Sequence, residues 1–241
     1  MSTQVALITG ASRGLGLEVA RAYARRGLRL ILTARGADPL AQAAAELAAT
    51  TDVVAFAGDV ADAAHAERLV RAGLDRFGRI DVLLNNASEL GPSPMPELAN
   101  LSIESFEDVL RVNVVAPLKL IQLVLPPMRK RGTGLIVNVT SDAGVQAYPT
   151  WGGYGSSKAA LEHLSRVLAA ELEGSGVRVF VVDPGDMDTA MHRAAEPGVD
   201  LSHLPAPSSV APAFVRLLDE RAGFGRYEAN QLAPVTARWI D

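Results

Sequence analysis

Short apolar runs alternate with longer amphipathic stretches along most of this sequence. The runs are rich in Val, Ile and Leu and hold few polar residues, which is typical of strands in a sheet that is covered on both faces. They predict strands at residues 5–9, 29–34, 53–57, 81–85, 135–139 and 177–182, with a last short strand near 225–229.

The stretches between these strands have helical periodicity, and glycines punctuate several of their ends. This alternation predicts an α/β fold with a single doubly wound, mostly parallel sheet flanked by helices, of the Rossmann type. Neither a linker nor an internal repeat divides the sequence, so we expect one domain over residues 1–241. The predicted helices span residues 14–26, 39–49, 62–77, 102–130, 153–174 and 208–220.

Composition narrows the function classes. Hydrophobic residues make up 49% of the 241 residues, enough for a sizeable core. The net charge is −4 and the basic run Arg129–Arg131 is short, which argues against nucleic-acid binding. The sequence has no cysteine, no metal-binding motif and no long apolar stretch, so we expect no metal site and no membrane partner. We expect a cytoplasmic protein.

Three glycines, Gly10, Gly14 and Gly16, follow the first predicted strand in the stretch TGASRGLG. The turn after the first strand of a doubly wound sheet faces the crevice where ligands bind, and the N–H groups at the start of the next helix attract an anion. Glycines let the backbone close on such a ligand, so this loop predicts a dinucleotide site. The spacing G-x-x-x-G-x-G differs from the G-x-G-x-x-G fingerprint, and a tight turn without a ligand is the alternative.

Further polar groups follow the later strands in a fixed order. Asn85–Ala87 ends the fourth predicted strand, Ser141 follows the fifth, and Tyr154 precedes Lys158 by four residues in the next helix. With the glycine loop they resemble, in order and approximate spacing over nearly the whole chain, the short-chain dehydrogenase/reductase family. The family's pattern also includes Asp59–Val60, Asn113 and Pro184–Gly185 of this sequence.

Two departures from the family pattern bear on this resemblance. Ser88 stands where the family usually has glycine after Asn-Asn-Ala, and its side chain would crowd the ribose side of the cofactor. The stretch RYEANQL, residues 226–232, replaces the family's common C-terminal Asp-Gly-Gly. We expect the second departure to affect subunit contacts more than the catalytic site.

Tyr154 and Lys158 share one helix face because about one turn separates them. A phenol has a pKa of about 10 and a nearby cation lowers it, so the pair is suited to exchange a proton with a carbonyl or alcohol near neutral pH. For these two residues alone, an ordinary pair on an amphipathic helix is the alternative. The family resemblance implies that Tyr154 is the acid/base and that Lys158 also holds the nicotinamide ribose.

Ser141 lies just past a predicted strand end, where ligand-contacting groups gather in an open parallel sheet. Its hydroxyl is suited to donate to a substrate oxygen, whereas Thr140 beside it is expected to be structural. Asn113 lies inside a long predicted helix, and Pro117 has no N–H to donate to the Asn113 carbonyl, which predicts a local kink. The resemblance implies that Asn113 helps to hold a proton-relaying water. The implied catalytic set is Asn113, Ser141, Tyr154 and Lys158.

The resemblance also implies how a nicotinamide dinucleotide is held. It assigns the adenine to Asp59 and Val60, and the nicotinamide carboxamide to Met187 and Thr189. The implied cofactor-binding set is Gly10, Ser12, Arg13, Gly14, Leu15, Gly16, Arg35, Asp59, Val60, Asn86, Ala87, Tyr154, Lys158, Pro184, Gly185, Met187 and Thr189.

The residues after the second predicted strand favour NADP(H) over NAD(H). An acidic residue at the end of that strand would accept from the ribose 2′-hydroxyl and repel a 2′-phosphate. Here Ala34 takes that position and Arg35 follows, and arginine matches a phosphate with charge-assisted bonds. Arg13 is a second cation that could reach the phosphate, and Asp38 is expected to cap the next helix. A solvated surface position is the alternative for Arg35.

These residues predict an NADP(H)-dependent oxidoreductase that transfers a hydride between nicotinamide and a carbonyl or secondary alcohol. A non-catalytic dinucleotide sensor or scaffold, and an epimerase or dehydratase on the same site, are the alternatives. The small-molecule substrate is expected between residues 88–97, residues 142–152 and a substrate loop at about 186–207. The resemblance implies that the helices near 102–130 and 153–174 pair in a homodimer or homotetramer. The expected apolar pocket residues are Leu90, Met95, Val145, Tyr148, Trp151, Met187, Met191 and Leu204.

Overall fold

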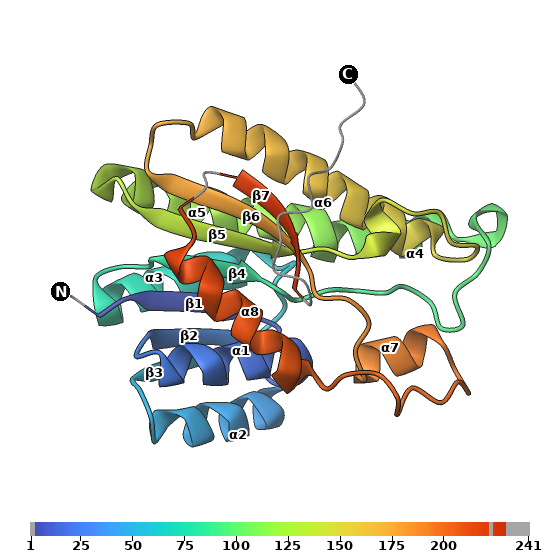
Figure 1. Cartoon of the computed structure of the whole chain (residues 1–241), viewed down its shortest axis with the longest axis horizontal. Coiled ribbons are helices and arrows are strands. Elements are labelled where there is room, and N and C mark those ends of the chain that lie inside the picture. The colour runs from blue at the N-terminus through green and yellow to red at the C-terminus, as the bar shows by residue number, and fades with distance from the viewer. Residues whose placement is uncertain (1–2, 222–223, 230–241) are drawn as a thin grey trace.

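Seven parallel strands form one sheet in the computed structural model, which describes residues 3–221 and 224–229 (Figure 1). The strand order is β3-β2-β1-β4-β5-β6-β7, and every neighbouring pair is parallel. The doubly wound parallel sheet predicted from the sequence is confirmed. The strands are β1 (Val5–Thr9), β2 (Arg29–Ala34), β3 (Val53–Ala57), β4 (Val82–Asn85), β5 (Gly134–Val139), β6 (Val177–Asp183) and β7 (Phe224–Glu228).

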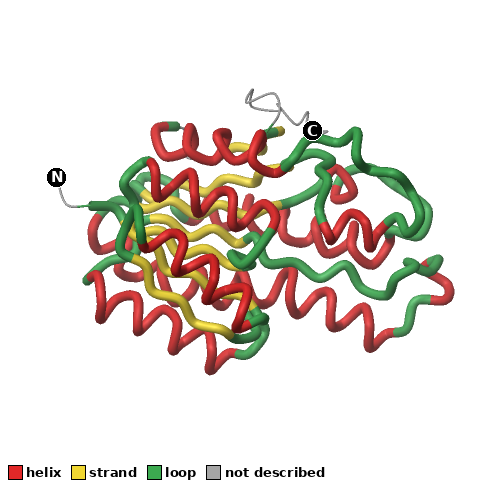
Figure 2. Tube along the Cα trace, turned by 90° about the horizontal axis from the view of Figure 1, so that it is seen from below, coloured by secondary structure: helices red, strands yellow, loops and turns green. Residues whose placement is uncertain are grey.

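Helices cover both faces of this sheet (Figures 1 and 2). One layer holds α1, α2 and α8, and the other holds α3, α5 and α6. Short 3-10 turns at Leu98–Asn100 and Asp142–Gly144 lie in the loops. The α-helices are α1 (Gly14–Arg25), α2 (Ala37–Ala48), α3 (Ala63–Phe77), α4 (Ile103–Leu110), α5 (Ala116–Arg131), α6 (Gly152–Glu171), α7 (Ala190–Ala195) and α8 (Pro207–Asp219).

The strands are apolar throughout because each contributes to two cores. In β1, Ala6 and Ile8 pack into the core under α1 and α8, whereas Val5 and Leu7 pack into the core under α3, α5 and α6. All five residues of β1 are buried. The continuous apolar runs in the sequence therefore reflect a sheet covered on both faces.

The sheet changes its winding direction between β1 and β4. The chain moves outward from β1 to β2 and β3, and then returns to pair β4 on the other side of β1. In a doubly wound sheet, a crevice for ligands lies at the carboxyl edge of the strands at such a switch point. This is where the sequence predicted a ligand.

The long helix after β4 is broken by one wide turn. A π-helical turn, Arg111–Val115, separates α4 from α5 and contains Asn113, near the predicted kink. By length and hydropathy (1.5 over its most apolar window), Ile103–Arg131 could cross a membrane. Its core residues, including Leu120, Val124 and Met128, are buried against the sheet, so the fold accounts for its apolar character.

The remaining boundaries differ from the prediction in detail. Gly36 is the N-cap of α2 and Asp38 lies in its first turn, so the prediction that Asp38 caps this helix is wrong. The predicted substrate loop contains the short helix α7 and leads into α8. Of the departing stretch RYEANQL, residues 226–228 lie within β7, and residues 230–232 lie outside the described part of the chain.

Candidate active site

A cavity of about 870 Å³ lies at the carboxyl edge of the strands and collects most of the predicted site residues. Gly16 and Asn113 are the predicted residues that lie behind its lining. The predicted residues that line it are Gly10, Ser12, Arg13, Gly14, Leu15, Arg35, Asp59, Val60, Asn86, Ala87, Ser141, Tyr154, Lys158, Pro184, Gly185, Met187 and Thr189.

The glycine turn after β1 is held against the loop after β4. A side chain at Gly16 would put its Cβ 2.3 Å from the Gly10 carbonyl oxygen, so α1 packs directly on the turn. Asn86 donates to the Thr9 carbonyl at 3.0 Å, which gives it a structural role besides its predicted place in the cofactor-binding set. Gly14, with a φ of +56°, has open space where its Cβ would be. Gly10 and Gly16 thus allow close packing, and Gly14 lies where a ligand can approach.

The first turn of α1 suits an anion. The helix begins at Gly14 and its N-cap residue is Arg13. In the described part of the chain, the Arg13 side chain makes no capping hydrogen bond with the first N–H groups of the helix. These N–H groups and the positive end of the helix dipole therefore face the cavity beside Ser12 and Arg13. The pyrophosphate of a dinucleotide fits this environment.

Arg35 follows β2 and lines the same region of the cavity. Its side chain is 67% exposed, and its Nη1 lies 3.2 Å from Glu89 Oε2 in the loop after β4. Ala34 ends the strand, so no carboxylate lies at the position that would face a ribose 2′-group. Asp59 accepts from the Ala61 backbone at 2.8 Å and lines the cavity.

Tyr154 and Lys158 lie in the first two turns of α6, at the other end of the cavity. Both are buried, and the Lys158 Nζ lies 5.3 Å from the centre of the Tyr154 ring. Nζ also donates to the Val139 carbonyl at 2.9 Å, which fixes the ammonium group against the end of β5. The predicted pair is therefore assembled on one helix face.

Burial dominates the ionisation of both groups. It lowers the pKa of Lys158 to about 8, although the Glu162 and Asp183 carboxylates act to raise it. Burial raises the pKa of Tyr154, while hydrogen bonds with Ser88 and Ser141 act in the opposite direction. The raised pKa of Tyr154 runs opposite to the lowering expected from a nearby cation, because the loss of hydration is the largest influence and the Asp183 and Asp142 carboxylates act in the same direction.

Ser141 faces the cavity immediately after β5. Its Oγ donates to Asp142 Oδ1 at 2.9 Å and accepts from the Ala143 backbone at 3.2 Å, so it also caps the short turn that follows. Thr140 beside it is buried and donates to Glu162 at 2.7 Å. The predicted division between a cavity-facing Ser141 and a structural Thr140 agrees with these contacts.

Asn113 acts on the cavity from behind through four hydrogen bonds. Its Oδ1 accepts from the Glu89 backbone at 2.7 Å and from the Ser88 hydroxyl at 3.0 Å. Its Nδ2 donates to the Glu89 carbonyl at 2.8 Å and to Ser157 Oγ at 2.9 Å. The side chain thus ties the loop after β4 to α6, and the Ser88 hydroxyl is directed toward Asn113 and Tyr154.

An apolar wall borders Tyr154. Leu90, Ala143 and Tyr154 form a small buried cluster against which Met95, Trp151, Met191 and Ala195 pack. Leu90, Trp151, Met187 and Met191 line the cavity as predicted, whereas Met95, Val145, Tyr148 and Leu204 do not. Val145 and Tyr148 are largely exposed, because the loop after the Asp142–Gly144 turn carries them outward. His192 also lines the cavity.

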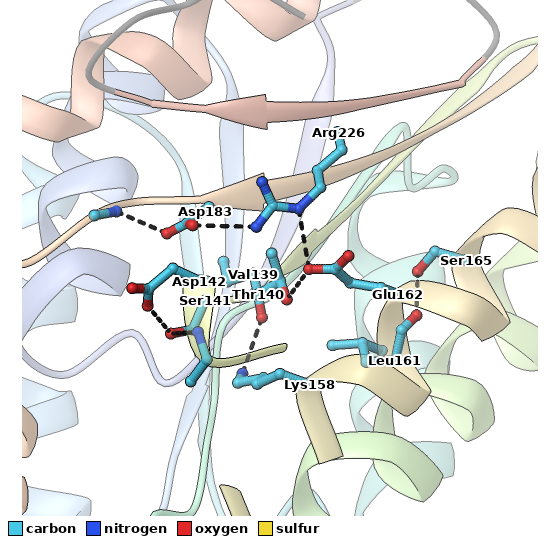
Figure 3. A network of polar contacts seen from close by, with 12 residues as sticks. Val139, Thr140, Ser141, Asp142, Lys158, Leu161, Glu162, Ser165, Asp183 and Arg226 are labelled. Carbon is cyan, nitrogen blue, oxygen red and sulfur yellow. Dashed lines mark hydrogen bonds and ion pairs between the residues drawn. The ribbon is translucent and has the colours of Figure 1, made fainter. Parts of the chain in front are cut away.

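Three buried charged residues near the site were missed from the sequence. Asp183 lines the cavity, whereas Glu162 and Arg226 are buried outside its lining. Figure 3 shows the three side chains and their contacts. Glu162 follows Lys158 by four residues, so helical spacing alone places it on the face of Tyr154 and Lys158. Nothing in the local sequence marks Arg226, which reaches the site only through the pairing of β7 with β6. Among residues 3–221 and 224–229, no cluster of His, Asp and Glu is arranged to hold a metal.

Comparisons with known proteins agree with this geometry. The family described as short chain dehydrogenase matches residues 4–200, and the chain belongs to this family. It is 36% identical over 191 residues to 2-(R)-hydroxypropyl-CoM dehydrogenase of Xanthobacter autotrophicus, covering 78% of this chain and 76% of that protein. It is 36% identical over 202 residues to a rhamnolipid-biosynthesis 3-oxoacyl-[acyl-carrier-protein] reductase of Pseudomonas aeruginosa, covering 80% and 76%.

A solved structure from the same family has the same fold. A short chain dehydrogenase of Shigella flexneri, solved in complex with NADP, superposes with a TM-score of 0.87 at 31% identity, covering 95% of this chain and 98% of that one. The protein is thus an oxidoreductase of the short chain dehydrogenase family with a dinucleotide-binding fold, as the order of motifs in the sequence predicted.

Proposed function

We propose that the protein is an NADP(H)-dependent oxidoreductase that transfers a hydride between nicotinamide and a carbonyl or secondary alcohol, with Tyr154 as the acid/base. The observation that carries this proposal is the gathering of Tyr154, Lys158 and Ser141 at one end of a cavity whose other end is the glycine turn at the start of α1. A protein that only bound a dinucleotide would not need the catalytic end.

The chemistry follows from the positions of three side chains. In carbonyl reduction, the Tyr154 hydroxyl donates its proton to the substrate oxygen, and the Ser141 hydroxyl donates a hydrogen bond to the same atom. The Lys158 ammonium, 5.3 Å from the ring centre, stabilises the phenolate that remains. NADP(H), when bound, supplies or accepts the hydride. Alcohol oxidation runs the same proton transfer in reverse.

Two cations support NADP(H) as the cofactor. Arg13 and Arg35 both line the cavity, and Ala34 at the end of β2 offers no carboxylate to repel a 2′-phosphate. Arg35 is paired with Glu89, but an exposed ion pair is worth only about 0–1 kcal/mol. A phosphate can therefore take over the guanidinium at little cost. The NADP complex of the Shigella relative points the same way.

The apolar wall supports a medium-sized ketone or secondary alcohol as the substrate. Leu90, Trp151 and Met191 line the cavity beside Tyr154 and give the substrate a mainly apolar surface. Asp142 and Asp186 add acidic groups to the lining, which suit a polar substituent on the substrate. The two named relatives act on different carbonyl or alcohol compounds, so the proposal stops at this class.

We also propose that the protein is cytoplasmic and that its subunits associate with one another. Val115 in the π turn, Leu118 in α5 and Val167 in α6 are 56%, 37% and 46% exposed. These are apolar residues on the helices expected to pair between subunits, which supports a homodimer or homotetramer. Light scattering at micromolar concentration tests this, and a monomer would contradict it.

The central test is turnover with a panel of ketones and secondary alcohols. Absorbance of the reduced nicotinamide is followed with NADPH and NADH for the ketones, and with NADP⁺ and NAD⁺ for the alcohols. We expect turnover with at least one compound, faster with the phosphorylated cofactor, and none with Tyr154→Phe. Tight NADPH binding without turnover across the panel would contradict the proposal.

A further inference from the structure

Four charged side chains are buried together behind Tyr154. Lys158, Glu162, Asp183 and Arg226 are 2%, 5%, 5% and 6% exposed, and they come from α6, β6 and β7. Arg226 lies between the two carboxylates: its Nε donates to Glu162 Oε1 at 3.1 Å and its Nη2 to Asp183 Oδ2 at 3.2 Å (Figure 3). The formal charges of the four balance.

Each carboxylate has a second contact that leads to the cavity lining. Glu162 accepts from Thr140 at 2.7 Å, and Thr140 follows Val139, whose carbonyl accepts from the Lys158 ammonium. Asp183 accepts from the Gly185 backbone at 3.0 Å, in the loop that lines the cavity after β6. Arg226 is therefore tied to two walls of the catalytic end without lining the cavity itself.

A purely structural role does not explain this arrangement well. Buried ion pairs often stabilise a protein no more than apolar residues of similar volume do, because removing charges from water costs several kcal/mol per ion. What the group does provide is a negative charge one helical turn from Lys158. Burial alone would drive Lys158 toward its neutral form, and the Glu162 carboxylate opposes this most, followed by Asp183.

We infer that Glu162 is a positioning residue that keeps Lys158 cationic and fixed beside Tyr154, and that Arg226 supports Glu162 from β7. The catalytic consequence of this inference rests on the proposed function, whereas its statement about the charge of Lys158 does not. The charged or titratable groups around Lys158 are Tyr154 and Glu162 on α6, Asp183 on β6 and, behind the carboxylates, Arg226 on β7. Asp142 and Asp183 act directly on Tyr154, whereas Glu162 acts on it through Lys158.

The first test measures the Lys158 titration directly. The sequence has only three lysines, Lys119, Lys130 and Lys158, so NMR of protein labelled with ¹³C-lysine resolves each side chain. The Lys158 signal is assigned as the one lost in Lys158→Arg. We expect Glu162→Gln to lower the Lys158 midpoint by about one pH unit, a tenfold change in the proton equilibrium. Glu171→Gln, which removes the same charge from the exposed end of α6, is the matched control and leaves the midpoint unchanged.

A second variant keeps the test usable if Glu162→Gln alone does not fold. Glu162→Gln leaves Lys158 and Arg226 with one buried carboxylate, whereas Glu162→Gln combined with Arg226→Gln restores the balance of charge. The double variant is expected to fold and still to titrate Lys158 below the wild-type midpoint. A Lys158 midpoint that equals the wild-type value in a folded Glu162→Gln protein, or in the double variant, overturns the inference.

The kinetic test separates this inference from the proposed function. With a substrate found in the panel, Glu162→Gln is expected to lower kcat about tenfold, with the KM for NADPH changed less than about twofold. Unchanged kcat would overturn the positioning role. If wild-type protein turns over no compound, the proposed function fails, and the lysine titration still decides whether Glu162 sets the charge of Lys158.

Discussion

The two ends of the cavity recognise their ligands in different ways. The end near β1 and β2 is built from a glycine turn, helix N–H groups and an arginine that is 67% exposed. The end near α6 is built from side chains, with Lys158 2% and Tyr154 9% exposed and the nearby charges paired behind them. The first end offers backbone N–H groups and a solvated cation to a charged ligand, whereas the second buries its ionisable groups, so that burial shifts the pKa values of Lys158 and Tyr154 from those in water.

This contrast predicts where single substitutions are most harmful. At the exposed end, one side chain contributes part of an affinity that backbone groups share. At the buried end, the proposed function assigns a chemical step to one hydroxyl or one charge, and removing that group leaves its neighbours without a partner. The substitutions below test the contrast in order of expected effect.

Tyr154→Phe is expected to lower kcat about 10²–10⁴-fold, because it removes the hydroxyl that exchanges the proton and keeps the ring. The ring packs edge-on against Trp151 with centroids 5.9 Å apart, so the cavity should keep its shape. Steady-state turnover and a fluorescence titration with NADPH measure the two effects, and NADPH affinity should be nearly unchanged. A variant that keeps more than about half of the wild-type rate would show that another group is the acid/base.

Lys158→Met tests the energetic consequence of burying a charge. The folded-state pKa of about 8 is below the ordinary 10.5, so the charged lysine destabilises the fold below about pH 8, and this cost is lost as pH rises toward 10.5. The shift corresponds to roughly 3 kcal/mol. The variant should therefore exceed wild type in unfolding free energy most at about pH 7, and its advantage should shrink by about pH 10. Denaturant melts at both pH values measure this, and a pH-independent difference would contradict it.

Arg35→Ala tests the exposed end. We expect the KM for NADPH to rise at least about tenfold, or roughly 1.4 kcal/mol, with little change for NADH. Arg216→Ala, which removes an exposed arginine from α8, is the matched control. Ala34→Asp should shift preference further toward NADH, because its carboxylate repels a 2′-phosphate. Equal use of the two cofactors by wild-type protein would remove the basis of this prediction.

Ser88→Gly tests the departure from the family pattern and should have the smallest effect. It removes the hydrogen bond to Asn113 and the one that lowers the pKa of Tyr154. We expect a loss of about 1 kcal/mol in unfolding free energy. The pH dependence of alcohol oxidation should move toward higher pH, because the phenolate becomes harder to form. A shift toward lower pH would mean that Ser88 acts differently on Tyr154.

The sequence was most informative where one local signal determines one structural feature. Apolar runs located the strands, and the order of short motifs located the residues that line the cavity. It was least informative where burial depends on distant packing. The direction of the Tyr154 pKa, the outward placement of Tyr148 and the contact of Arg226 with Glu162 all depend on elements that meet only in the folded chain.

For two residues, the predicted role also differs from the position in the structure. Gly16 and Asn113 were expected to touch the cofactor or its relay, and they instead lie one layer behind the cavity surface. Gly16 allows close packing and Asn113 joins two segments of the wall. A motif marks positions that a family uses, and only the structure distinguishes a ligand contact from its support.

The wide turn at Arg111–Val115 has a consequence for how this chain tolerates insertions and deletions. A π turn holds about one more residue than an α turn, so deleting a residue there would give a continuous α-helix and move the side chains within the turn around the helix axis. Asn113 would then lose its alignment with the loop after β4 and with α6. Conservative substitutions within this helix should be accepted far more readily than any change in its length.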